Sequence, residues 1–111
     1  MTVQLKQALL ESIEIKKLLL NKVYLDKIKQ IGDLIIKSIT DGNKVMLCGN
    51  GGSAADAQHL AAEMLVRLRP KINRQALAAI SLTLDVSTIT ACGNDFGFDH
   101  LFERNVLALG R

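Results

Sequence analysis

The chain has 111 residues, of which 49% are hydrophobic, and its formal net charge is +3 at pH 7. This length allows one compact domain at most, and the apolar content predicts a globular fold. Only 4% of the residues are aromatic and none is tryptophan, so few side chains could stack on nucleic-acid bases. The modest charge and the shortage of aromatic residues argue against a nucleic-acid-binding function.

The sequence also predicts where the protein works. No apolar run approaches the roughly 20 residues that a membrane-spanning helix needs, and polar residues from Gln4 to Glu11 interrupt any signal-peptide core. Cys48 and Cys92 lack the spacing of a metal finger or a redox pair, which predicts reduced thiols. We therefore expect a cytoplasmic protein with no membrane partner.

Residues 1–40 are predicted to form a helical N-terminal segment. Apolar residues recur at helical spacing from Val3 to about Leu20 and again from Leu25 to Ile39, where the turn signal Asp41-Gly42-Asn43 stops the pattern. The apolar residues of the first helix spread widely round its axis, which predicts that it packs on another subunit.

Residues 44–111 are predicted to form an α/β part. We expect strands at 44–48 and 75–81, a helix at 53–68 with Ser53 as N-cap and Asp56 in a capping box, a turn and short helix at 83–91, a loop at 92–97, and a last helix at 98–109 closed by Gly110. This alternation is typical of a doubly wound α/β fold with a parallel sheet. Because two strands cannot bury several helices, the sequence predicts that residues 1–111 are the N-terminal part of a single larger domain, incomplete at its C-terminus.

The first candidate site is the strand-to-helix turn Gly49-Asn50-Gly51-Gly52-Ser53. Unpaired backbone N–H groups and the positive end of a helix converge at such a turn and bind anionic or polyhydroxylated molecules. The turn matches neither the dinucleotide fingerprint nor the ATP-binding loop. The alternative is a purely structural turn in which Gly51 and Gly52 supply positive φ angles.

His59 and Glu63 form the second candidate, because residues four apart share one face of a helix. The pair suits two metal ligands, or one ligand and a general base, although two ligands alone would leave a zinc site incomplete. The alternative is an ordinary surface contact. A third candidate, Asn94-Asp95, follows the second strand at the sheet edge where open α/β folds bind ligands, and its alternative is ordinary turn chemistry.

Residues 47–63, with Ala91–Phe98 and the closing Val106–Arg111, resemble the phosphoheptose isomerase family, which has the sugar isomerase (SIS) fold. The resemblance implies an aldose–ketose isomerase that converts D-sedoheptulose 7-phosphate to D-glycero-D-manno-heptose 7-phosphate, toward the heptose of lipopolysaccharide. It further implies a cytoplasmic, zinc-binding homotetramer with active sites at subunit interfaces.

Carried over by position, the resemblance implies substrate contacts at Asn50, Gly51, Gly52, Asn94 and Asp95. His59 and Glu63 match two zinc ligands, and Glu63 also matches a substrate-binding residue and the base. Arg67 is left out, because Val66 precedes it where the family often has glycine. The family's phosphate loop and its later Gln and His would follow Arg111, so the chain is expected to be about three-fifths of the enzyme and inactive alone.

Two alternatives stay open. Non-catalytic SIS proteins, similar to the DnaA initiator-associating protein, share the glycine turn and the histidine but tend to lack the acid at the position of Glu63. The presence of Glu63 favours the enzyme. The other alternative is a folding unit with no activity of its own.

Overall fold

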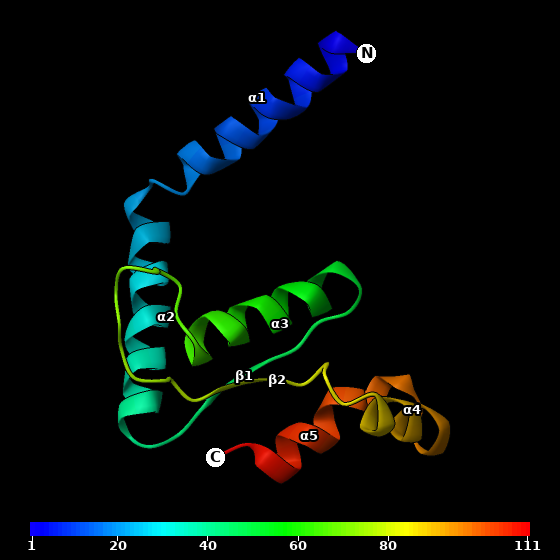
Figure 1. The fold of residues 1–111 in the computed structure, drawn as a ribbon. Helices are drawn as coiled ribbons and strands as arrows, with labels where there is room; N and C mark the ends of the chain where they lie inside the picture. The colour runs from blue at the N-terminus through cyan, green and yellow to red at the C-terminus, as the bar shows by residue number, and fades with distance from the viewer. The chain divides into compact units, whose positions relative to one another are not determined.

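The structure is a computed structural model that describes residues 1–111. Its elements in chain order are α1 (Thr2–Leu18), α2 (Lys22–Thr40), β1 (Val45–Leu47), α3 (Gly52–Leu65), β2 (Ala79–Ser81), α4 (Val86–Asp95), the 3-10 turn η1 (Phe98–His100) and α5 (Leu101–Leu109) (Figure 1). By their contacts they form two compact units, residues 1–36 and residues 37–111. The expected division into 1–40 and 44–111 stays a prediction. None of the helices is both long and apolar enough to cross a membrane.

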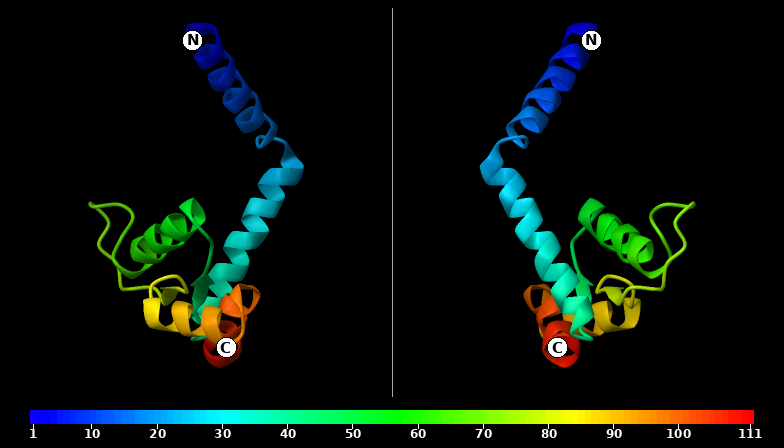
Figure 2. Two further views of the ribbon diagram at one scale, coloured as in Figure 1. Left: turned by 90° about the vertical axis from the view of Figure 1, so that its right-hand side faces the viewer. Right: turned by 90° about the vertical axis from the view of Figure 1, so that its left-hand side faces the viewer.

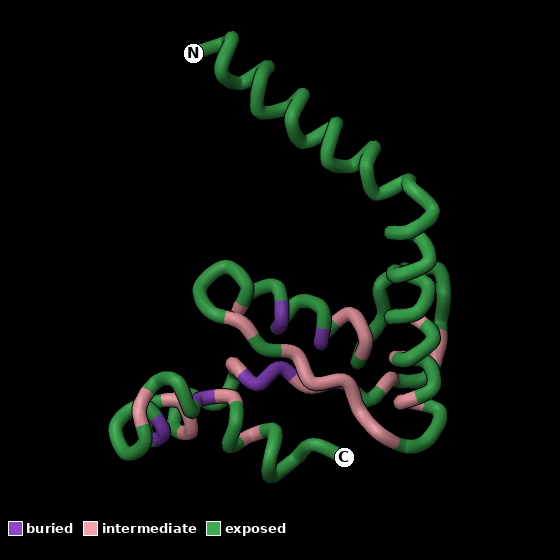
Figure 3. The backbone as a smooth tube through the Cα atoms, turned by 180° about the vertical axis from the view of Figure 1, so that it is seen from behind, coloured by how far each residue is buried: buried purple, intermediate pink, exposed green.

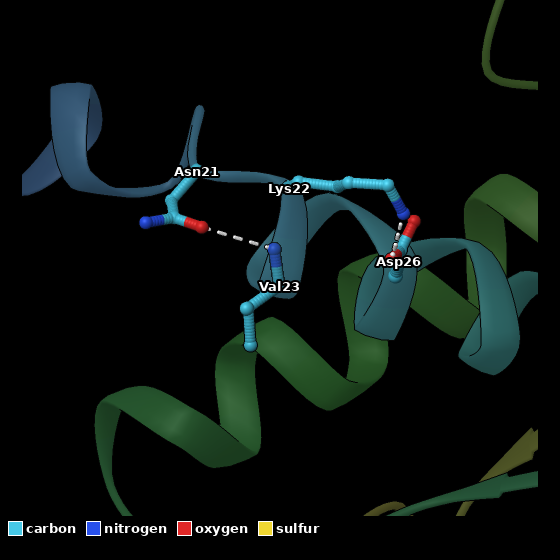
Figure 4. Close-up of polar contacts among 4 residues, drawn as sticks. All are labelled: Asn21, Lys22, Val23 and Asp26. Atoms are coloured by element: carbon cyan, nitrogen blue, oxygen red, sulfur yellow. Dashed lines mark hydrogen bonds and ion pairs between the residues drawn. The ribbon is translucent and has the colours of Figure 1, made fainter.

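The N-terminal unit holds α1 and most of α2. α1 has no buried residue, although it carries large apolar side chains such as Leu5 and Leu9. α2 begins at Lys22, where the Asn21 side chain accepts a hydrogen bond from Val23 N at 3.1 Å (Figure 4). Exposed ion pairs such as Lys22–Asp26, at 2.5 Å, add at most a few tenths of a kcal/mol each.

The second unit is built on a βαβ arrangement. β1 and β2 pair in parallel, with Val45 opposite Ala79 and Leu47 opposite Ser81. The crossover helix α3 packs against both strands. Figures 1 and 2 place α3 on one side of the two strands and α4 and α5 on the other. Helices on both sides of a parallel sheet confirm the predicted doubly wound α/β class.

The core of the second unit consists mainly of small side chains. The buried residues are Ala57, Ala61, Ala79, Ser81, Leu82, Cys92 and Leu101. They lie on α3, on and just after β2, and on α4 and α5, as the burial colouring shows (Figure 3). Small residues at the contact let α3 approach the strands closely. Most of the large apolar side chains remain exposed, so the apolar content predicted more burial than this chain alone provides.

The stretch from Thr83 to Gly97 differs from the prediction. The expected loop at 92–97 is wrong for its first four residues, because α4 continues to Asp95 and ends where Gly97 takes a φ of +97°. The helix starts firmly at Asp85, whose side chain accepts hydrogen bonds from Ser87 N and Thr88 N. The Thr88 hydroxyl also donates to the Asp85 carboxylate and, with these backbone bonds, lowers the pKa of Asp85 below 3.8.

Candidate functional site

In the glycine turn after β1, the backbone of Gly49 comes very close to the backbone of Ser53 at the start of α3. A Cβ on Gly49 would lie 2.6 Å from the Ser53 backbone, so no other residue fits this close approach. Gly51 takes a φ of +56° and is the N-cap, which corrects the prediction that Ser53 caps the helix. Of the two positive φ angles in the structural alternative, Gly51 has one and Gly52 does not. No side chain caps this end, so the Asp56 capping box is also wrong.

This turn presents unsatisfied donors to solvent. Asn50, Gly51 and Gly52 are all exposed, and the N–H groups of Gly51 and Gly52 donate no hydrogen bond within the chain. They lie at the positive end of the 14-residue helix α3. The geometry therefore suits an anionic or hydroxyl-bearing ligand, as the motif predicted.

α3 brings His59 and Glu63 together. His59 Nε2 lies 3.4 Å from Glu63 Oε1, with 72% of the histidine side chain and 25% of the glutamate side chain exposed. Ala57 and Ala61, on the buried side of the helix, hold it against the sheet. The Glu63 Oε2 atom is buried and has no hydrogen-bond partner. A carboxylate oxygen withdrawn from water without a partner is costly, which is typical of an atom that awaits a ligand or a proton.

Asn94 and Asp95 occupy the last turn of α4 and are both exposed. Asn94 Nδ2 donates to Asp95 Oδ1 at 2.8 Å, and neither side chain bonds to the glycine turn, to His59 or to Glu63. Asp95 also borders a cavity of about 210 Å³, together with Thr88, Cys92 and Arg104. The structure thus joins His59 to Glu63 directly, and it leaves the role of Asn94 and Asp95 a prediction.

A hydroxyl network that the sequence analysis did not single out links β2 to the first half of α3. The buried Ser81 hydroxyl lies 2.7 Å from the Thr83 hydroxyl. Thr83 also accepts from Gln58 Nε2 at 3.4 Å and reaches the Ala54 carbonyl at 3.5 Å. These bonds fix the helix start relative to the end of β2, but the Ser-Leu-Thr sequence carries no signal for such a network.

The residues present fit only part of a metal site. No three His, Cys, Asp or Glu side chains gather closely enough to hold a metal ion. His59 and Glu63 supply one nitrogen and one buried, unpartnered oxygen on the same helix face. Those donors suit zinc in kind, but a catalytic zinc site normally has three protein ligands, and this pair would supply only two.

The family of the protein follows from its sequence match. The SIS domain family model matches residues 12–111, and the chain belongs to that family.

Within the family, the matching relatives carry one name. The chain is 54% identical over 86 residues to the phosphoheptose isomerase of Chlorobaculum parvum, which covers 78% of this chain and 41% of that protein. It is 48% identical over 106 residues to the phosphoheptose isomerase of Aquifex aeolicus, and this match covers 96% of this chain and 54% of that protein. The chain thus spans about half the length of the curated relatives that it matches.

Solved structures agree with the sequence matches. The phosphoheptose isomerase GmhA from Neisseria gonorrhoeae superposes with a TM-score of 0.85 at 42% identity, covering 99% of this chain and 55% of that one. The one from Francisella tularensis gives 0.86 at 36% identity, covering 100% and 57%. The SIS fold and the similarity to phosphoheptose isomerases, both predicted from the sequence, are confirmed.

Proposed function

We propose that this chain forms part of an isomerase that interconverts D-sedoheptulose 7-phosphate and D-glycero-D-manno-heptose 7-phosphate, in the supply of heptose for lipopolysaccharide. The observation that carries the proposal is the Glu63 carboxylate, because one oxygen is buried without a partner and the other lies beside His59. The names of the matching relatives agree with this substrate.

Glu63 is the catalytic residue in this proposal. A proton on a carbon next to a carbonyl group is weakly acidic, so its removal needs a carboxylate held close to it. Glu63 takes the proton from C1 of the open-chain ketose, which leaves an enediol. It then returns the proton to C2 while the hydroxyl proton moves from O1 to O2, so no atom is gained or lost.

The glycine turn binds the substrate in the same proposal. Asn50, Gly51 and Gly52 offer an exposed amide side chain and two free backbone N–H groups at the positive end of α3. At the end of α4, Asn94 offers an amide that can donate or accept, and the Asp95 carboxylate can accept hydrogen bonds from sugar hydroxyls. The backbone and amide donors recognise the hydroxyl and phosphate groups of a sugar phosphate.

His59 and Glu63 would also hold a zinc ion, completed by ligands other than these two. When bound, zinc would polarise the carbonyl and hydroxyl oxygens of the substrate. The unpartnered Glu63 Oε2 supports this assignment, because a metal would satisfy it.

The proposal includes a homotetramer in the cytoplasm. Large apolar side chains on α1, such as Leu5, Leu9 and Ile13, are exposed in the single chain, and burying them against other subunits would be favourable. Both cysteines are free thiols, which suits a reducing compartment.

The test uses the natural gene product that carries these residues, purified and supplied with sedoheptulose 7-phosphate in deuterated water. We expect aldose to form and solvent deuterium to enter at C2. A purified, zinc-supplied protein that does neither, yet binds a cellular protein through the glycine turn, would favour the non-catalytic SIS alternative.

A further inference from the structure

Glu63 lies in the last turn of α3, where the backbone hydrogen bonding of the helix is incomplete. The helix ends at Leu65, and its last backbone bond runs from Val66 N to the Ala62 carbonyl at 2.8 Å. The carbonyls of Glu63 and Met64 therefore have no partner within the helix. Final turns of helices fray readily, and α3 has no basic residue in its own last turn to counter this.

Arg74 supplies the missing partners from the segment that leads into β2. Its Nη2 donates to the Glu63 carbonyl at 2.6 Å, and its Nη1 donates to the Met64 carbonyl at 2.8 Å. The half-buried guanidinium thus spans two consecutive carbonyls with two charged donors, which form stronger bonds than neutral ones. Leu77 N adds a bond to the Met64 carbonyl at 3.1 Å.

We propose that Arg74 is a positioning residue for the Glu63 carboxylate, which it fixes by holding the backbone carbonyl of the same residue and of the next one. The inference rests on the proposed function. Arg74 anchors the last turn of α3 to the chain entering β2, the strand against which α3 packs. A displacement of about 1 Å in a reacting group can cost about 100-fold in rate, so this anchor bears on catalysis without touching the substrate.

The test compares Arg74→Met and Arg74→Lys with Lys71→Met in the natural gene product. Lys71 is a matched control, because it lies in the same connection, carries the same charge, is exposed and makes no side-chain hydrogen bond or ion pair. We expect Arg74→Met to lower kcat about 10- to 100-fold with little change in KM. The kcat of Arg74→Lys, which keeps one charged group, should lie between those of Arg74→Met and the parent. The kcat of Lys71→Met should equal that of the parent.

Amide hydrogen exchange gives a readout independent of activity. In Arg74→Met the Val66 and Leu77 amides should exchange faster, while amides of α2 keep their rates, because only the end of α3 is released. A kcat equal to that of the parent in Arg74→Met, or unchanged exchange at both amides, would overturn the inference. If the parent protein does not turn over sedoheptulose 7-phosphate, the proposed function is wrong. The exchange rates of the Val66 and Leu77 amides in Arg74→Met still test the anchoring role of Arg74 in that case, and unchanged rates would overturn it.

Discussion

The ends of α3 and α4 differ in how firmly they hold the residues predicted to bind ligand. The crossover helix α3 packs against both strands, its start is fixed by the close approach of Gly49, and its end is held by Arg74. The other helix, α4, packs chiefly against η1 and α5, and the side chains of its terminal Asn94 and Asp95 hydrogen-bond only to each other. This difference favours the proposal that the chemistry lies on α3, where side chains are placed in advance, and that α4 contributes adaptable contacts.

The largest expected effect tests whether α3 carries the chemistry. Glu63→Gln keeps the size of the side chain but cannot accept a proton, so kcat should fall about 10²- to 10⁴-fold. Asn94→Ala, at the end of α4, should act mainly through KM. Turnover and solvent-deuterium exchange measure both variants. Near-normal turnover and exchange in Glu63→Gln would remove Glu63 as the base and reverse the ranking of the two helices.

His59→Ala should produce a loss of a different kind. A missing metal ligand lowers zinc affinity, often about 10- to 100-fold even for outer partners of a site, so added zinc should restore part of the turnover. Added zinc should not restore Glu63→Gln. Turnover across a zinc series separates the two variants, and equal rescue of both would contradict their separate roles.

Two glycine substitutions compare the helices for stability. Gly49→Ala places a Cβ 2.6 Å from the Ser53 backbone and should lower the free energy of unfolding by about 1–3 kcal/mol. Gly93→Ala in α4 meets nothing within 4 Å and should raise it by about 0.5–1 kcal/mol, because alanine favours helix. Urea unfolding measures both. A neutral Gly49→Ala would mean that the glycine turn is not tightly packed.

The smallest effect concerns the start of α4 and depends on pH. The pKa of Asp85 is lowered in the folded state by its bonds to Thr88 and Ser87, so the carboxylate stabilises α4 above pH 3.8, and this contribution is lost as pH falls through the lowered pKa. Asp85→Ala should therefore lower the unfolding midpoint slightly at pH 7 and not at strongly acidic pH. Thermal scans at both pH values measure this, and an equal loss at both would rule out the charged cap.

The sequence allowed prediction of the element order, the parallel βαβ unit and the His59–Glu63 contact, because these follow from local periodicity and spacing. It mispredicted the helix cap, since Ser53 is a common capping residue while the close approach at Gly49 is visible only in three dimensions. The helical state of Cys92 to Asp95 was missed because glycine and asparagine favour turns, yet the Asp85 cap and the contacts of α4 outweigh that preference. The sequence could not predict the hydrogen bonds of Arg74 to the end of α3, because the two carbonyl groups lie about ten residues earlier in the chain.

The parallel pairing of β1 with β2 also bears on how this protein folds. Val45 pairs with Ala79 only after the more than thirty residues between them have closed into a loop. Closing this loop costs conformational entropy, and no strand contact offsets that cost until both strands are in place. The α3 helix shortens that loop, since it forms from local bonds on a far faster timescale than strand pairing. We therefore expect α3 and the two strands to form the folding nucleus, with substitutions at Ala57 or Ala61 slowing refolding more than substitutions on α5.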